Sequence, residues 1–131
     1  MKTIRLELTR EQATAVMDAA ELLARLHIGQ FREITWAFLD RFVTDGKYDA
    51  ARRERADDLL KQLQREIFGD HGPAYRTITF ERCWAVYTTI RYALAWHDHP
   101  EGGITVNFDR PLGYGERMPR CVVEEISDDG P

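Results

Sequence analysis

Apolar and polar residues alternate in three short stretches of the sequence, one close to its start and two close to its end. These stretches are residues 3–8, 104–108 and 121–126, and their alternating apolar positions include Ile4, Leu6, Leu8, Ile104, Val106, Phe108, Cys121 and Val123. A period of two is expected for a strand that is covered on one face. The pattern therefore predicts three strands, with the last two joined as a hairpin.

Between the first and second predicted strands, apolar residues recur every three or four positions, the spacing of a helix that buries one face. The helical segments are residues 9–27, 31–43, 50–68 and 79–96. Thr9 is followed three residues later by Gln12, a capping-box pattern that predicts where the first helix begins. Gly29 is expected to end that helix. Asp45 and Gly46 predict a turn before the third helix.

The two middle helices are predicted to differ in what covers them. The second segment is apolar on two sides, with Phe31 in one stripe and Trp36 in another, which is typical of a central helix or of one shared with a second subunit. We therefore expect a homodimer that forms through this helix. The third segment is predicted to pair Asp57 with Lys61 at i,i+4 spacing and to end at Gly69. Its predicted buried face consists of Ala56, Leu59, Leu63 and Ile67.

These elements together predict a single α+β domain that spans residues 1–131. About four helices pack on one face of a small, mainly antiparallel three-stranded sheet, in the order β-α-α-α-α-β-β. The fourth helix carries many large apolar residues and is expected to anchor the core. A chain of this length buries a core without disulfides, so Cys83 and Cys121 are predicted to be reduced core residues. The acidic end, residues 127–131, is expected to fray.

Composition and charge narrow the classes of function. The chain is 44% hydrophobic and 31% charged, and its formal net charge is -4. General nucleic-acid binders usually carry a strong positive excess, so this class is not expected. No apolar run approaches the roughly 20 residues that span a bilayer, and the charged start of the chain does not resemble a signal peptide. We therefore expect a soluble, cytoplasmic protein without membrane association.

Two histidines near the end of the fourth predicted helix are candidate metal ligands. His97 and His99 flank Asp98, a spacing that points both imidazoles one way if the backbone is extended, and His71 could join them. Histidines that follow a helix end also serve simply to interact with the negative end of its dipole. The chain has no phosphate-binding glycine motif and no nucleophile elbow, so no catalytic residue and no cofactor are predicted.

A cluster of basic residues lies at the start of the third predicted helix. Arg52, Arg53 and Arg55 are interspersed with acidic residues, and a basic first turn opposes the helix dipole. A solvated face is therefore the better interpretation. Any ligand of this cluster would be anionic.

The strongest candidate site is the connection between the last two predicted strands, residues 109–119. Hairpin connections usually take about two to five residues, so an ordered connection of this length is unusual. Its prolines and glycines restrict the backbone, which lowers the entropy lost on binding, and its arginines and tyrosine suit an anionic partner. The predicted ligand-binding residues are Arg110, Tyr114, Arg117, Arg120, Asn107 and Trp96. The alternative is a loop that packs on its own domain and binds nothing.

Two segments of the chain resemble small uncharacterised proteins carried by bacteriophages and prophages. They are residues 8–34, LTREQATAVMDAAELLARLHIGQFREI, and residues 90–112, IRYALAWHDHPEGGITVNFDRPL. The resemblance implies no agreed activity. It implies a setting in which small accessory proteins act on the host by binding.

The sequence therefore predicts a non-enzymatic, phage-type binding protein that acts on the host. Its partner is an anionic small molecule or a host protein, and in the most concrete version it sequesters a nucleotide-derived defence signal. One alternative is a protein–protein inhibitor of a host defence or regulatory protein. Another is a small metal-dependent hydrolase that uses His97 and His99.

Overall fold

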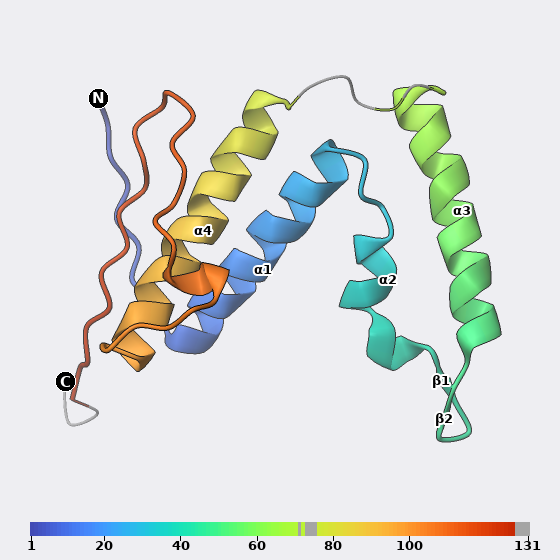
Figure 1. Cartoon of the computed structure of the whole chain (residues 1–131), viewed down its shortest axis with the longest axis horizontal. Helices are drawn as coiled ribbons and strands as arrows, with labels where there is room; N and C mark the ends of the chain where they lie inside the picture. Colours follow the sequence, from blue (N-terminus) through green and yellow to red (C-terminus); the bar gives the residue numbers. More distant parts are fainter. Residues whose placement is uncertain (71, 73–75, 128–131) are drawn as a thin grey trace. The chain divides into compact units, whose positions relative to one another are not determined.

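The computed structural model describes residues 1–70, 72 and 76–127. Helices make up most of this part of the chain, and a short hairpin and segments without regular structure connect them (Figure 1). The elements are α1 (Arg10–His27), α2 (Glu33–Ala37), a 3₁₀ helix (Leu39–Arg41), β1 (Val43–Thr44), β2 (Lys47–Tyr48), α3 (Ala50–Phe68), α4 (Ile78–Asp98) and a second 3₁₀ helix (Val106–Phe108). The predicted α+β class with a three-stranded sheet is therefore wrong, because the described chain is mostly helical.

None of the predicted strands forms within the described residues. Residues 3–8 and 121–126 contain no strand, and residues 104–108 contain the second 3₁₀ helix. Ile4 and Leu6 are exposed, so no described residue covers the apolar face that their alternation marks. A strand also needs a neighbour that pairs with its backbone N–H and C=O groups. Alternation within one segment does not supply that neighbour.

The described residues hold one sheet, the antiparallel pair β1 and β2. Val43 is paired with Tyr48 across it. Asp45 and Gly46 connect the strands with φ angles of 52° and 75°, and two consecutive left-handed residues are typical of a tight hairpin turn. The predicted turn at this pair is confirmed.

Helix α1 begins at the predicted capping box. The Thr9 N–H donates to Gln12 Oε1 (2.9 Å), and the Gln12 N–H donates to Thr9 Oγ1 (3.1 Å), so two backbone donors at the helix start are bonded. After His27, Gly29 has a φ of 82°, which glycine adopts without strain. The predicted start and end of this helix are confirmed.

The variant Thr9→Ala is expected to lower the free energy of unfolding by about 1 kcal/mol, because it removes the acceptor for the Gln12 N–H. Urea denaturation of both proteins measures the change. Thr9→Ser keeps the hydroxyl and is the matched control, with a clearly smaller expected loss. Equal losses for the two variants would contradict a capping role.

The predicted second helix, residues 31–43, is interrupted. Helix α2 covers only part of it, and Phe38 leaves the helical conformation with φ −112° and ψ 26°. Aromatic and β-branched residues are frequent in this stretch, and they lose side-chain freedom in a helix. Phe31 is buried, whereas Trp36 and Phe38 are exposed. The expected homodimer through this segment stays a prediction.

Helix α3 forms where predicted, between two caps. At its start, the Asp49 carboxylate accepts a hydrogen bond from the Arg52 N–H (3.0 Å). At its end, the Gly69 N–H donates to the Arg65 carbonyl (2.7 Å), and Gly69 has a φ of 76°. The predicted end at Gly69 is confirmed.

The face of α3 that was predicted to be buried is largely exposed. Leu59, Leu63 and Ile67 are 65%, 48% and 58% exposed. Helix α2 packs on α3, and Asp57 pairs with Arg32 in place of the predicted partner Lys61. Both corrections have one cause: the side of α3 that contacts its neighbour is rotated away from its apolar stripe.

The chain divides into two compact units, Met1–Ala20 with Arg82–Pro131 and Glu21–Glu81. The buried residues of the first unit include Ala85, Tyr87 and Leu94, and those of the second include Ala24, Phe31 and Thr35. The three buried residues named for the first unit lie on α4, the helix that was expected to anchor the core. Residues 128–131 of the predicted acidic tail lie outside the described part of the chain. No described helix is long and apolar enough to cross a membrane.

Candidate functional site

A cleft of about 440 Å³ lies on the unit formed by Glu21–Glu81. This volume falls within the range of roughly 300–1,000 Å³ that is usual for small-molecule sites. Its lining includes Arg32 and Trp36 near α2, Tyr48 from β2, and Arg53, Asp57 and Lys61 from α3. The cleft therefore combines charged groups with two aromatic rings.

A buried threonine fixes the acidic side of the cleft. Thr35 is 2% exposed, and its hydroxyl donates to Asp57 Oδ1 at 2.7 Å. The Thr35 hydroxyl oxygen also lies 3.0 Å from the carbonyl oxygen of Arg32. The Asp57 side chain is 13% exposed, and its Oδ2 lies 3.8 Å from Arg32 Nε. Asp57 is thus held by a neutral donor and a cation, as a largely buried carboxylate requires.

Arg53 is held by neutral groups. Its Nη1 donates to Tyr48 Oη (3.1 Å), its Nε lies 3.5 Å from Thr35 Oγ1, and its Cζ lies 4.4 Å from the centroid of the Trp36 ring. Within the described residues, no carboxylate oxygen lies within 4.0 Å of its guanidinium nitrogens. A guanidinium has five N–H donors, and three of those on Arg53 make no hydrogen bond with a described residue. Sequence reasoning missed this site, because it treated the arginine cluster as a solvated face.

The predicted loop arginines are exposed, and no described contact brings them together at one site. Arg110 and Arg120 are exposed and make no ion pair with any described residue, and Arg117 donates to Met1 Sδ at 3.5 Å. Tyr114 is half-buried. The segment is not a hairpin connection, because no strand flanks it among the described residues. Its role as a binding loop stays a prediction.

An ion pair ties this segment to α4. Arg82 Nε donates to Glu116 Oε2 (3.0 Å), and Arg82 Nη2 donates to Glu116 Oε1 (2.8 Å). These hydrogen bonds lower the pKa of the Glu116 carboxyl and raise that of the Arg82 guanidinium. The segment is thus joined to α4 by an exposed ion pair that requires a charged Glu116.

Lowering the pH is expected to break the ion pair between Arg82 and Glu116. Because the folded pKa of Glu116 is depressed, the stabilisation is complete above the unfolded value of about 4.3 and is lost as the pH falls through the folded value. We therefore compare melting temperatures at neutral pH and at a pH below the pKa of Glu116 in the unfolded chain. Between these two pH values, the melting temperature of Glu116→Gln should fall less than that of the parent protein. Thermal melts of both proteins across this range measure it. Parallel curves would contradict the assignment.

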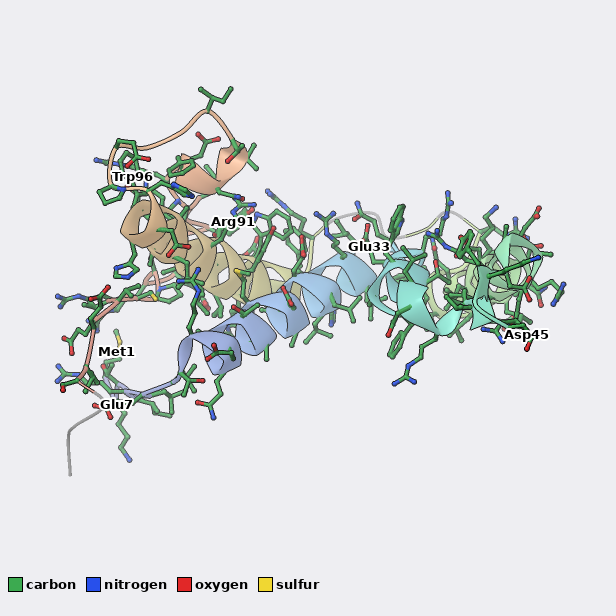
Figure 2. The ribbon with its side chains drawn as sticks, turned by 90° about the horizontal axis from the view of Figure 1, so that it is seen from below. Met1, Glu7, Glu33, Asp45, Arg91 and Trp96 are labelled. Carbon is green, nitrogen blue, oxygen red and sulfur yellow. The ribbon has the colours of Figure 1, made fainter. Side chains whose placement is uncertain are left out.

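Trp96 and Asn107 have different surroundings. Trp96, at the end of α4 (Figure 2), donates from Nε1 to the Phe108 carbonyl at 3.3 Å and packs edge-on against the Phe108 ring. A Cβ on Gly102 would lie 2.9 Å from the Trp96 ring, and one on Gly103 would lie 2.4 Å from Phe108. The double glycine therefore lets these rings pack closely. Asn107 is exposed. The contacts of Trp96 are structural, and its predicted role in binding stays untested.

The two candidate metal ligands contact different carboxylates. His97 Nε2 lies 3.5 Å from Glu125 Oε1, and His99 Nδ1 lies 3.5 Å from Glu101 Oε1. The described residues contain no group of three or more histidine, cysteine, aspartate or glutamate side chains arranged to hold a metal ion. His71 lies outside the described residues. The metal-dependent alternative gains no support from these contacts.

The two cysteines do not have the surroundings of nucleophiles. Cys83 and Cys121 are free and half-buried. Burial raises the pKa of both thiols, which disfavours the reactive thiolate at neutral pH. This direction is opposite to the one that a catalytic cysteine needs.

Comparison of the chain with protein-family models, with curated proteins and with solved structures finds no match. The interpretation of the site therefore depends on its own geometry.

Proposed function

We propose that the protein is a non-enzymatic binding protein that holds a small anionic molecule in the cleft between α2 and α3. The observation that carries this proposal is the environment of Arg53, a guanidinium whose partners in the cleft are a phenol, a hydroxyl and an indole ring. Charge-assisted hydrogen bonds to an anion are about twice as strong as neutral ones. An anionic ligand would thus supply the partner that the described chain does not.

The proposal keeps the class of function expected from the sequence and moves the site. In the phage setting suggested by the resemblance, such a protein would sequester a nucleotide-derived signal of the host. The cleft supports a small-molecule partner better than the segment 109–119 does, because its hydrogen-bond donors and aromatic rings line one site.

A panel of cyclic and linear nucleotides together with 4-aminobenzoate, each added separately to the purified protein, tests this function. A ligand at about 100 times its dissociation constant stabilises the folded state by about 2.7 kcal/mol, which should raise the melting temperature by several degrees. At least one anionic member is expected to do so. A flat response across the whole panel would contradict the proposal.

A protein partner is the second candidate, supported by the exposed apolar stripe of α3. Leu59, Leu63 and Ile67 follow one another at helical spacing, and exposed apolar stripes of this kind often mark protein contacts. An inhibitor of a host protein would use this stripe. This second hypothesis predicts that Leu63→Glu abolishes binding to an identified host target, whereas Arg53→Ala leaves that binding intact.

A further inference from the structure

The lining of the cleft limits which anion it accepts. We infer that the cleft selects a monoanion, meaning a ligand that combines one phosphodiester or one carboxylate with an aromatic ring that carries amino groups. This inference rests on the proposed function and adds the chemical class of the ligand.

The anionic end of the ligand is assigned to Arg53 and Tyr48. Tyr48 Oη accepts a hydrogen bond from Arg53 Nη1 at 3.1 Å, so its own hydroxyl proton is available to donate elsewhere. The guanidinium and the phenol therefore offer adjacent donors to the oxygens of one phosphate or carboxylate. The planar fork of a guanidinium can donate two hydrogen bonds to two oxygens of one such group.

The aromatic part of the ligand is assigned to Trp36. The Arg53 guanidinium lies over its ring, and the side chain is nevertheless 57% exposed. An anion held by Arg53 is thus next to an accessible indole surface. Offset stacking on that surface favours a ligand in which an aromatic ring follows the anionic group closely.

The number of charges on the ligand is limited by the rest of the lining. The basic residues Arg32, Arg53 and Lys61 are matched by the acidic residues Glu54, Asp57 and Asp58. Because Arg32 and Asp57 pair with each other, Arg53 and Lys61 remain beside Glu54 and Asp58. This remaining lining is neutral overall, so it offers no excess of positive charge to a second or third negative charge on the ligand. Its two carboxylates accept hydrogen bonds from ligand amino groups. One negative charge with amino donors therefore fits this balance better than a polyphosphate does.

Calorimetric titration of the full chain with four probes tests the class. The probes are cyclic adenosine monophosphate, 4-aminobenzoate, adenosine and adenosine triphosphate. Either monoanion, or both, should bind at least tenfold more tightly than the neutral nucleoside and the triphosphate, and comparison of the two monoanions separates a phosphodiester from a carboxylate source. The combined variant Glu54→Gln with Asp58→Asn should improve triphosphate binding selectively.

The possible outcomes separate the class from the function. Tighter binding of the triphosphate than of both monoanions would overturn the class and leave the proposed function standing. Tightest binding of adenosine, or no binding of any probe, would overturn both. Arg53→Lys keeps the charge and removes the fork, so it should weaken monoanion binding while its circular dichroism spectrum stays that of the parent. Unchanged monoanion affinity in this variant would also contradict the assignment.

Discussion

Replacing Phe31 with alanine is expected to lower the free energy of unfolding by about 3–5 kcal/mol. Phe31 is 7% exposed, and its ring meets that of Phe68 edge-on, with centroids 5.9 Å apart and planes at 82°. The contact joins the segment before α2 to the last turn of α3. Removing the ring leaves a cavity between them and removes the aromatic pair.

Urea denaturation measures this loss, which is a large part of the roughly 5–15 kcal/mol that stabilises a typical domain. Phe38→Ala is the matched control, because Phe38 lies in the same segment and is exposed. It should cost much less. Similar losses for the two variants would show that Phe31 is not the buried contact described.

Replacing Arg53 with alanine is expected to weaken binding of an anionic ligand by roughly 10- to 150-fold. This range corresponds to the loss of a hydrogen bond to a charged group, about 1.5–3 kcal/mol. The Arg53 guanidinium contacts the Tyr48 phenol and the Trp36 indole in the cleft. Isothermal titration with the tightest anion of the panel measures the change.

Arg55→Ala is the matched control for this experiment. Arg55 is exposed on the same helix, two residues further along, and is not part of the cleft lining. Its loss changes the net charge of the protein by the same amount as the loss of Arg53. If both variants weaken binding equally, general electrostatic attraction explains the effect and the cleft does not.

Local signals in the sequence predicted the helix boundaries well. Three of these signals fix the backbone within a few residues, so their effect does not depend on the rest of the fold. They are Thr9 with Gln12, the Asp45–Gly46 pair, and Gly69. The bounds of α1, α3 and α4 therefore agree closely with the predicted segments.

Non-local requirements explain the predictions that were wrong. The alternation in residues 3–8 describes one strand, but a sheet depends on a second segment arriving beside it. The stripe of α3 that contains Leu63 has the spacing of a buried face, yet α2 packs on the adjacent side of the helix. Periodicity shows which face is apolar and not which neighbour covers it.

The cleft depends on pairings that no short window of sequence contains. The acidic neighbours of Arg53 suggested that its charge was already balanced. In the fold, Asp57 is bonded to Thr35 and lies beside Arg32, and Arg53 is left with neutral partners. Its stacking on Trp36 joins residues from two helices. An aromatic residue and an arginine at this separation carry no recognisable signal without the fold.

The central claim, that the ligand sits in the α2–α3 cleft, is tested most directly by the indole N–H resonances. The chain has three tryptophans, of which Trp36 lines the cleft whereas Trp84 and Trp96 lie on α4. Single replacements by phenylalanine assign the signals. Titration with cyclic adenosine monophosphate, or with the tightest anion of the panel, is predicted to shift the Trp36 resonance and leave the other two unchanged. A shift of Trp96 without one of Trp36 would contradict the account and place the ligand near the C-terminal segment.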